Sequence, residues 1–147
     1  MAKGKKQRRL SRNERRLNLE DRRSWDPKRV RRHLLEAEVG TIHKDAPIRI
    51  GLSYPNPYHT GMSSLGFQVI YRMLNEQTDV SAERVFLPDD VSLYRQKNWQ
   101  PLSIESGRML GQFDLLAFSV AYDLDIPGFF ELLHLGGIPA FRNERTK

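Results

Sequence analysis

The residues best suited to chemistry lie in the loop Tyr54–Ser64, which contains hydroxyl groups, an amide and one glycine and leads into a predicted helix. Hydroxyl and amide donors beside the free N–H groups of a helix can bind an anion, a phosphate or an amide-bearing ligand. The loop is neither a Walker loop nor a dinucleotide-binding Gly-x-Gly-x-x-Gly fingerprint. The alternative is structural: the prolines and Gly61 shape a tight turn, and Thr60 or Ser63 caps the helix.

A second polar segment follows the third predicted strand. In open α/β sheets ligands bind at the carboxyl ends of the strands, so we expect this segment and the first loop to face each other across one crevice. There Tyr122 would stack on a flat ligand, and Gly61 would allow close approach of the backbone. The predicted cofactor-binding residues are Asn56, Thr60, Gly61, Ser63, Ser119, Tyr122 and Asp123.

The remaining candidate groups have simpler structural interpretations. His59 is a conceivable metal or cobalt ligand, but a lone histidine without a second ligand at suitable spacing is more often a surface residue. The pairs Asp89-Asp90 and Asp123-x-Asp125 have the types needed for acid–base chemistry. Each pair precedes a predicted helix, where capping is the simpler role. We therefore predict no catalytic residue and no metal ligand.

Three strands, predicted at residues 48–54, 81–87 and 115–121, position these groups. Their alternation with helices is typical of a doubly wound parallel α/β sheet, Rossmann-like or flavodoxin-like. Such a sheet usually has about five strands, and the sequence after Gly137 begins another strand without completing it. We therefore expect a partial sheet, truncated at its C-terminal side, and a chain that is weakly stable, oligomeric or dependent on a partner.

The clearest predicted helix runs from Met62 to about Asn75. Its apolar stripe consists of Met62, Leu65, Gly66, Val69, Ile70 and Met73. Because these residues recur at helical spacing, we predict that the stripe packs against the sheet. Val69→Asp should then unfold the domain by burying an unpaired charge.

Composition limits the class of protein. The chain has 147 residues, 39% of them hydrophobic, which fits one ordinary domain. It has no cysteine, which excludes disulfides, thiolate-bound zinc and an iron–sulfur cluster held by this chain. No stretch approaches the roughly 18 apolar residues of a membrane span, and the N-terminus lacks the apolar segment of a signal peptide. We expect a cytoplasmic protein without membrane contact.

The positive charge is confined to an N-terminal arm. Residues 1–33 have a net charge of +10 and residues 34–147 a net charge of −4, which together give +6. The arm has too few large apolar residues to fold alone, so we interpret it as disordered, with a short helix over residues 30–39 at the start of the body. It either binds RNA or is a solvated extension. The candidate nucleic-acid contacts are Lys3, Lys5, Lys6, Arg8, Arg9, Arg12, Arg15 and Arg16.

Several ordered segments carry a family resemblance that spans about residues 38–142. They are Glu38–Lys44, Arg49–Gln68, Leu74–Glu76, Ala82–Pro88, Ile104–Ser106 and Phe113–Tyr122. Together they resemble the N-terminal, Rossmann-like and cobalamin-binding-like domain of a family of bacterial radical SAM proteins. The resemblance implies a following barrel whose three cysteines hold a [4Fe–4S] cluster that cleaves S-adenosylmethionine. This chain would bind a cofactor or substrate and present it to that barrel.

The sequence departs from the pattern of that family in two respects. It has no cysteine, so this chain alone would not perform radical chemistry. It also lacks the Asp-x-His-x-x-Gly motif of many cobalamin proteins, so cobalamin, the candidate cofactor, would bind without a protein ligand to cobalt. Two alternatives remain open: an RNA- or ribosome-associated adaptor that uses the arm, and a domain that has lost its ligand and only packs against a partner.

Overall fold

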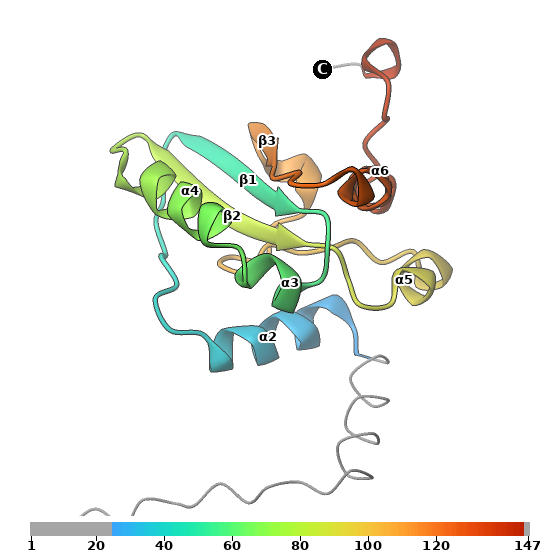
Figure 1. Ribbon diagram of the computed structural model, residues 1–147, viewed down its shortest axis with the longest axis horizontal. Coiled ribbons are helices and arrows are strands. Elements are labelled where there is room, and N and C mark those ends of the chain that lie inside the picture. The colour runs from blue at the N-terminus through green and yellow to red at the C-terminus, as the bar shows by residue number, and fades with distance from the viewer. Residues whose placement is uncertain (1–24, 146–147) are drawn as a thin grey trace, which may run out of the picture.

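The computed structural model describes residues 25–145, which form a three-stranded parallel sheet with helices on both faces (Figure 1). Strand β1 (Ile48–Tyr54) is central, and β2 (Val80–Phe86) and β3 (Leu115–Phe118) pair with it on either side. This arrangement confirms the predicted α/β fold with parallel pairing. β1 has its predicted bounds, and β3 ends three residues before the predicted Ala121.

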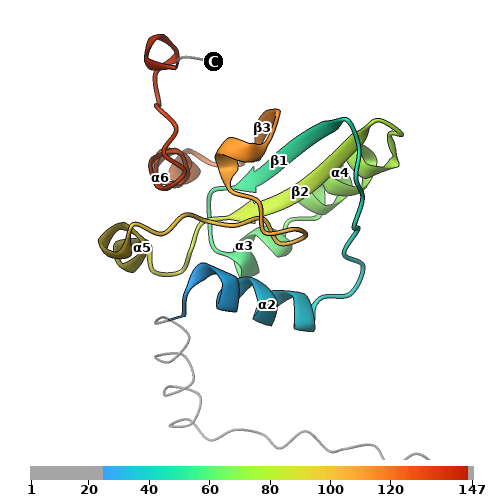
Figure 2. The ribbon, with the colours of Figure 1, turned by 180° about the vertical axis from the view of Figure 1, so that it is seen from behind.

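The helices divide between the two faces of the sheet (Figures 1 and 2). They are α2 (Pro27–Ala37), α3 (Tyr58–Met62), α4 (Leu65–Glu76), α5 (Val91–Lys97) and α6 (Ile126–Leu135), with short 3₁₀ turns at Leu110–Gln112, Asp123–Asp125 and Arg142–Glu144. Helices α2, α3 and α4 contribute to one apolar cluster, and α6 contributes Leu132 to the other. Asp90 caps α5, as predicted, by accepting a hydrogen bond from the amide of Leu93 at 2.9 Å. In the described part of the chain, no helix has the length and apolar character needed to span a membrane.

Helix α2 begins inside the segment that we assigned to the arm. Asp26 caps it by accepting from the amide of Arg29 at 2.9 Å, and Pro27 occupies its first turn. The helix ends at Ala37, ahead of Gly40, whose φ of +91° is favourable for glycine. Residues 27–33 are therefore helical, and the predicted disorder of residues 1–24 lies outside the described residues.

The predicted packing of the α4 stripe, which we define as Leu65, Val69, Ile70 and Met73, is wrong. These residues point away from the sheet, with exposed fractions of 77%, 52%, 44% and 57%. The buried residues of α4 are Phe67, Tyr71 and Asn75. The ring of Phe67 contacts those of Tyr54 and Phe86, with centroids 5.3 and 5.5 Å apart. The aromatic face of the helix, and not its aliphatic face, covers the sheet.

The outer edge of β2 is sealed by groups from other elements. The Asn75 side chain pairs with the backbone of Ala82, accepting from its N–H and donating to its carbonyl, both at 3.0 Å. The amide of Ile104 donates to the carbonyl of Arg84 at 2.8 Å, and the Glu105 carboxylate accepts from the amide of Arg84 at 2.7 Å. These contacts occupy the backbone groups that an additional strand would need.

A buried ion cluster joins β2 to α2 and to the loop after α5. The guanidinium of Arg84, 4% exposed, lies between the carboxylates of Glu105 (2.7 Å) and Glu38 (2.9 Å). Tyr58 donates to Glu38 at 2.6 Å, and Thr41 donates to it at 2.7 Å. Burial alone would raise the pKa of Glu38, but the hydrogen bonds from Arg84, Tyr58 and Thr41 outweigh burial and hold this pKa below its ordinary value.

Removal of the Arg84 charge should destabilise the protein strongly. Arg84→Met leaves two buried carboxylates uncompensated, so we expect the free energy of unfolding to fall by about 3–5 kcal/mol in urea titrations followed by circular dichroism. Arg49→Met is the matched control, because Arg49 forms an ion pair with Asp114 that is about half exposed. This control should cost much less stability than Arg84→Met, because solvent screens an exposed ion pair. Equal losses in the two variants would contradict a structural role for the buried cluster.

The orientation of α4 yields a second prediction. Phe67→Ala should lower the free energy of unfolding by about 3–5 kcal/mol, because Phe67 is fully buried between two aromatic rings. Val69→Asp should cost less than about 1 kcal/mol in this chain, because Val69 is exposed. Urea titration of both variants measures the difference. A larger loss for Val69→Asp would show that the aliphatic stripe faces the sheet.

Candidate functional site

The loops after β1 and β3 meet at a buried carboxylate. Asp125, 5% exposed, accepts a hydrogen bond from the side-chain amide of Asn56 at 2.7 Å. Its second oxygen accepts from the backbone amides of Ala121 (2.9 Å) and Tyr122 (3.0 Å). Asp125 makes no side-chain cap to α6, so its predicted capping role is replaced by a bridge between the two strand ends.

Two glycines allow the segments around this bridge to pack closely. A Cβ on Gly128 of α6 would lie 2.0 Å from the backbone oxygen of Pro55, so α6 packs directly on the end of β1. A Cβ on Gly61 would lie 2.5 Å from the ring of Phe86. Gly61 therefore faces a core aromatic residue, which accounts for its small size without any ligand.

The structure brings together only part of the predicted crevice. Asn56 and the segment beginning at Ser119 are adjacent, and the amide of Ser119 donates to the carbonyl of Ser53 at 2.9 Å. Thr60 and Ser63 are exposed, and the Ser63 hydroxyl donates to the carbonyl of Thr60. Tyr122 and Asp123 are also exposed. A ligand site at these residues stays a prediction.

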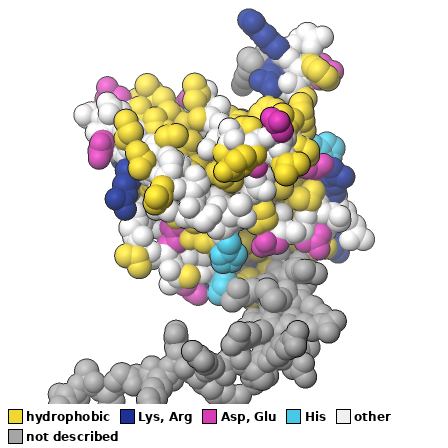
Figure 3. Space-filling model, viewed as in Figure 1, with side chains coloured by type: hydrophobic (Ala, Val, Ile, Leu, Met, Phe, Trp, Pro, Cys, Tyr) yellow, Lys and Arg dark blue, Asp and Glu magenta, His cyan; other side chains and the backbone are white. Residues whose placement is uncertain are grey.

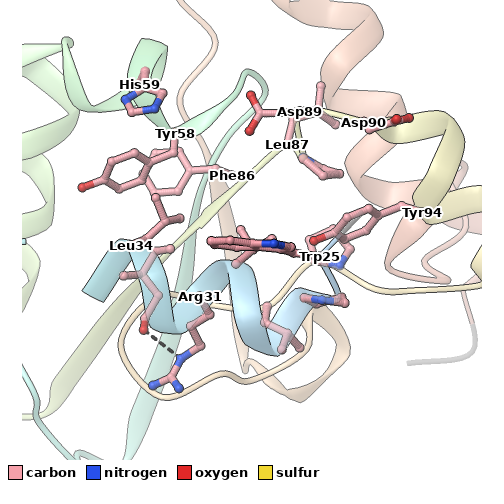
Figure 4. A pocket seen from close by; sticks show the side chains of 16 residues that line it. Trp25, Arg31, Leu34, Tyr58, His59, Phe86, Leu87, Asp89, Asp90 and Tyr94 are labelled. Carbon is pink, nitrogen blue, oxygen red and sulfur yellow. Dashed lines mark hydrogen bonds between the residues drawn. The ribbon is translucent and has the colours of Figure 1, made fainter. Parts of the chain in front are cut away.

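A cavity of about 270 Å³ lies on the other side of the loop after β1, at the carboxyl end of β2 (Figure 4). It is lined by α2, the beginning of α3, the segment from β2 into α5, and the loop at residues 101–104. The lining residues that carry rings or charges include Trp25, Arg31, Tyr58, Phe86, Asp89 and Tyr94. None of the seven predicted cofactor-binding residues lines it.

Sequence reasoning missed this cavity for identifiable reasons. Trp25 and Arg31 lie in the segment that the sequence predicts to be a basic arm, and the position of Asp89 before a helix predicts a cap. One signal was available: Tyr58 and the segment Phe86–Asp89 follow the ends of two strands, where α/β sheets bind ligands. His59 is exposed beside the Tyr58 ring, with centroids 5.5 Å apart. Within residues 25–145, no group of three or more histidine, aspartate or glutamate side chains is arranged to hold a metal ion.

Cobalamin binding by this chain stays a prediction, because the cavity at the carboxyl end of β2 is smaller than cobalamin requires. Pockets for drug-sized ligands measure roughly 300–1,000 Å³ and cobalamin is larger than such ligands, whereas the cavity measures about 270 Å³. The crevice between β1 and β3 is bridged by Asn56 and Asp125 and narrowed by the contact of Gly128 with Pro55. The eight candidate RNA contacts of the arm lie outside the described residues.

The bridge at Asp125 predicts a pH dependence of stability. Burial alone would raise the pKa of Asp125, but its hydrogen bonds to Ala121, Tyr122 and Asn56 hold the pKa below its ordinary value. Its contribution to stability is therefore present above the unfolded-state pKa of about 3.9 and is lost as the pH falls through the folded-state pKa. We expect the free energy of unfolding to decrease less between about pH 5 and pH 2 in Asp125→Asn than in the wild type.

Asp123→Asn, an exposed change in the same turn, is the control and should retain the wild-type pH dependence. Urea titrations at several pH values provide the measurement. If Asp125→Asn and the wild type lost stability in parallel, Asp125 would not be the acceptor that joins the strand ends.

Comparison with known proteins identifies the family. A family model for the N-terminal region of radical SAM proteins matches residues 66–147, which begin in α4 and make up more than half of the chain. No curated protein and no solved structure gives a significant match. The match agrees with the family part of the resemblance seen in the sequence, although it begins after β1. The chain therefore belongs to the family of radical SAM proteins, as part of their N-terminal region.

Proposed function

We propose that this chain holds a substrate or another small ligand for the catalytic domain of a radical SAM protein and packs against that domain at the β3 edge of its sheet. The observation that carries the proposal is the contrast between the two edges. The β2 edge is sealed by Asn75, Ile104 and Glu105, whereas β3 has no second neighbouring strand among residues 25–145. An additional strand or a partner domain can therefore join the sheet only at β3.

The surface around β3 has the character of an interface. Strands of parallel sheets are usually covered on both faces, yet the β3 and α6 region exposes a group of large apolar side chains. They are Leu115 (52% exposed), Val120 (46%), Leu124 (89%), Ile126 (45%) and Phe130 (48%). Large apolar side chains that remain exposed in this number are typical of protein–protein contact regions. We call these five residues the β3 surface.

The α4 stripe supports the same interpretation from another face of the molecule. Its four aliphatic residues remain exposed although the helix is firmly packed through Phe67 and Tyr71. Figure 3 shows hydrophobic side chains gathered on this side of the molecule. A domain that buries neither surface within itself is suited to packing against a larger protein.

The chemistry divides between this chain and the rest of the protein. A [4Fe–4S] cluster is usually held by thiolates, and this chain has no cysteine, so the cluster and S-adenosylmethionine belong to the catalytic domain in our proposal. This chain contributes binding and orientation. Its cavity at the carboxyl edge of the sheet is the place where it would hold a ligand.

Association with the cognate radical SAM catalytic domain tests the docking part of the proposal. Sedimentation velocity of a mixture should show a complex. Leu124→Asp should weaken that complex at least about tenfold, because it places a charge in an apolar interface. The domain should still fold, because Leu124 is 89% exposed.

Val39→Asp is the matched control, since Val39 is fully exposed but lies at the end of α2, away from the β3 surface. It should leave association unchanged. A chain that sediments as a compact monomer, melts cooperatively and does not associate with the catalytic domain would overturn the docking proposal.

A further inference from the structure

The cavity at the carboxyl end of β2 has aromatic walls. The rings of Trp25, Tyr58, Phe86 and Tyr94 come from four different segments and surround the space shown in Figure 4. Two of these walls are held by contact with each other and with the buried ion cluster. Tyr58 packs edge-on against Phe86 at 5.2 Å between centroids, and its hydroxyl is bound to Glu38. The walls are therefore held in place by the core and by the buried ion cluster.

The lining of the cavity holds the two carboxylates of Asp89 and Asp90 and one arginine, and the guanidinium of Arg29 lies 4.2 Å from the centroid of the Trp25 ring. Arg31 is the cation in its lining, and its guanidinium already donates to the carbonyls of Ile104 and Glu105. Asp89 is exposed, lines the cavity and has no hydrogen-bond or ion-pair partner among residues 25–145. Burial raises the pKa of the Tyr94 phenol, and the negative charges of Asp26 and Asp89 raise it further.

We propose that this cavity binds a small organic cation: a primary amine or guanidinium attached to a flat or apolar body. The body lies among the four rings, and the charged group lies near the free carboxylate of Asp89. Aromatic ring faces attract cations through their quadrupoles, and a carboxylate at the rim adds a charged hydrogen-bond acceptor. This inference deepens the ligand-holding role proposed above and names the class of ligand.

The cavity favours this class over the obvious alternatives. An anion would meet Asp89 and Asp90 without a free cation to balance it, because the Arg31 side chain is occupied by backbone carbonyls. A neutral apolar ligand would fit the rings but would gain nothing from Asp89. A ligand that combines a ring with an ammonium group uses both features of the lining.

The test compares three probes that share a phenyl ring on a short chain and end in a cation, a neutral hydroxyl or an anion: phenethylamine, 2-phenylethanol and phenylacetate. Each is titrated into the full chain while the indole N–H signal of Trp25 is followed by NMR. We expect phenethylamine to bind at least about tenfold more tightly than either other probe, which corresponds to one charge-assisted hydrogen bond. Equal binding of the three probes, tighter binding of phenylacetate or no binding of any probe would overturn the proposal.

Asp89→Asn keeps the shape of the side chain and removes its charge. It should abolish the preference for phenethylamine over 2-phenylethanol, and because Asp89 is exposed the circular dichroism spectrum should not change. Asp123→Asn, another exposed aspartate that does not line the cavity, should keep the preference. An unchanged preference in Asp89→Asn would contradict the assigned role of this carboxylate.

Two further arms separate the possible explanations. A peptide with the sequence of residues 1–24 competes with phenethylamine if the natural cation is a basic side chain of the arm, and does not compete if it is a small molecule. Association of Asp89→Asn with the catalytic domain should equal that of the wild type. If the wild-type chain binds phenethylamine but does not associate with the catalytic domain, the proposed docking is rejected and the cation site stands.

Discussion

The fold depends on the compensation of one buried positive charge. Arg84 lies in the edge strand of the sheet with its guanidinium almost fully buried, a position that is tolerated only because Glu38 and Glu105 neutralise it. Glu38 follows α2, and Glu105 belongs to the loop after α5. The charge on β2 therefore holds two otherwise separate segments against the sheet, and these segments form two sides of the aromatic cavity.

The same interaction makes the domain asymmetric. Because Glu105 and Ile104 occupy the backbone groups of Arg84, β2 cannot pair with another strand, and any extension of the sheet is directed to β3. At that end a hydrogen bond from Asn56 to Asp125 joins the loops after β1 and β3, whereas the aromatic cavity lies on the side of α2. One edge is thus committed to internal contacts, and the other is the edge at which we propose that a partner docks.

The strands were predictable because each is marked by neighbouring residues. Alternating or continuous apolar runs indicate the strands, and the prolines that follow β1 and β2 mark their ends. The orientation of α4 was not predictable in the same way. The aliphatic stripe is the larger apolar feature in sequence, but the buried face is chosen by Phe67, which fits between two rings, and by Asn75, which pairs with the backbone of β2. The cavity was missed because it depends on Arg84 meeting Glu38 across 46 positions of sequence, a contact that no local pattern reports.

Hydrogen–deuterium exchange of the backbone amides tests the central claim that one edge of the sheet is complete and the other awaits a partner. In the isolated chain the account predicts slow exchange in β2 and faster exchange in β3, because β3 is short and has one neighbour. Addition of the cognate radical SAM catalytic domain should slow exchange in β3 and leave β2 unchanged. Protection of β3 equal to that of β2 in the isolated chain, with no change on adding the catalytic domain, would contradict the account.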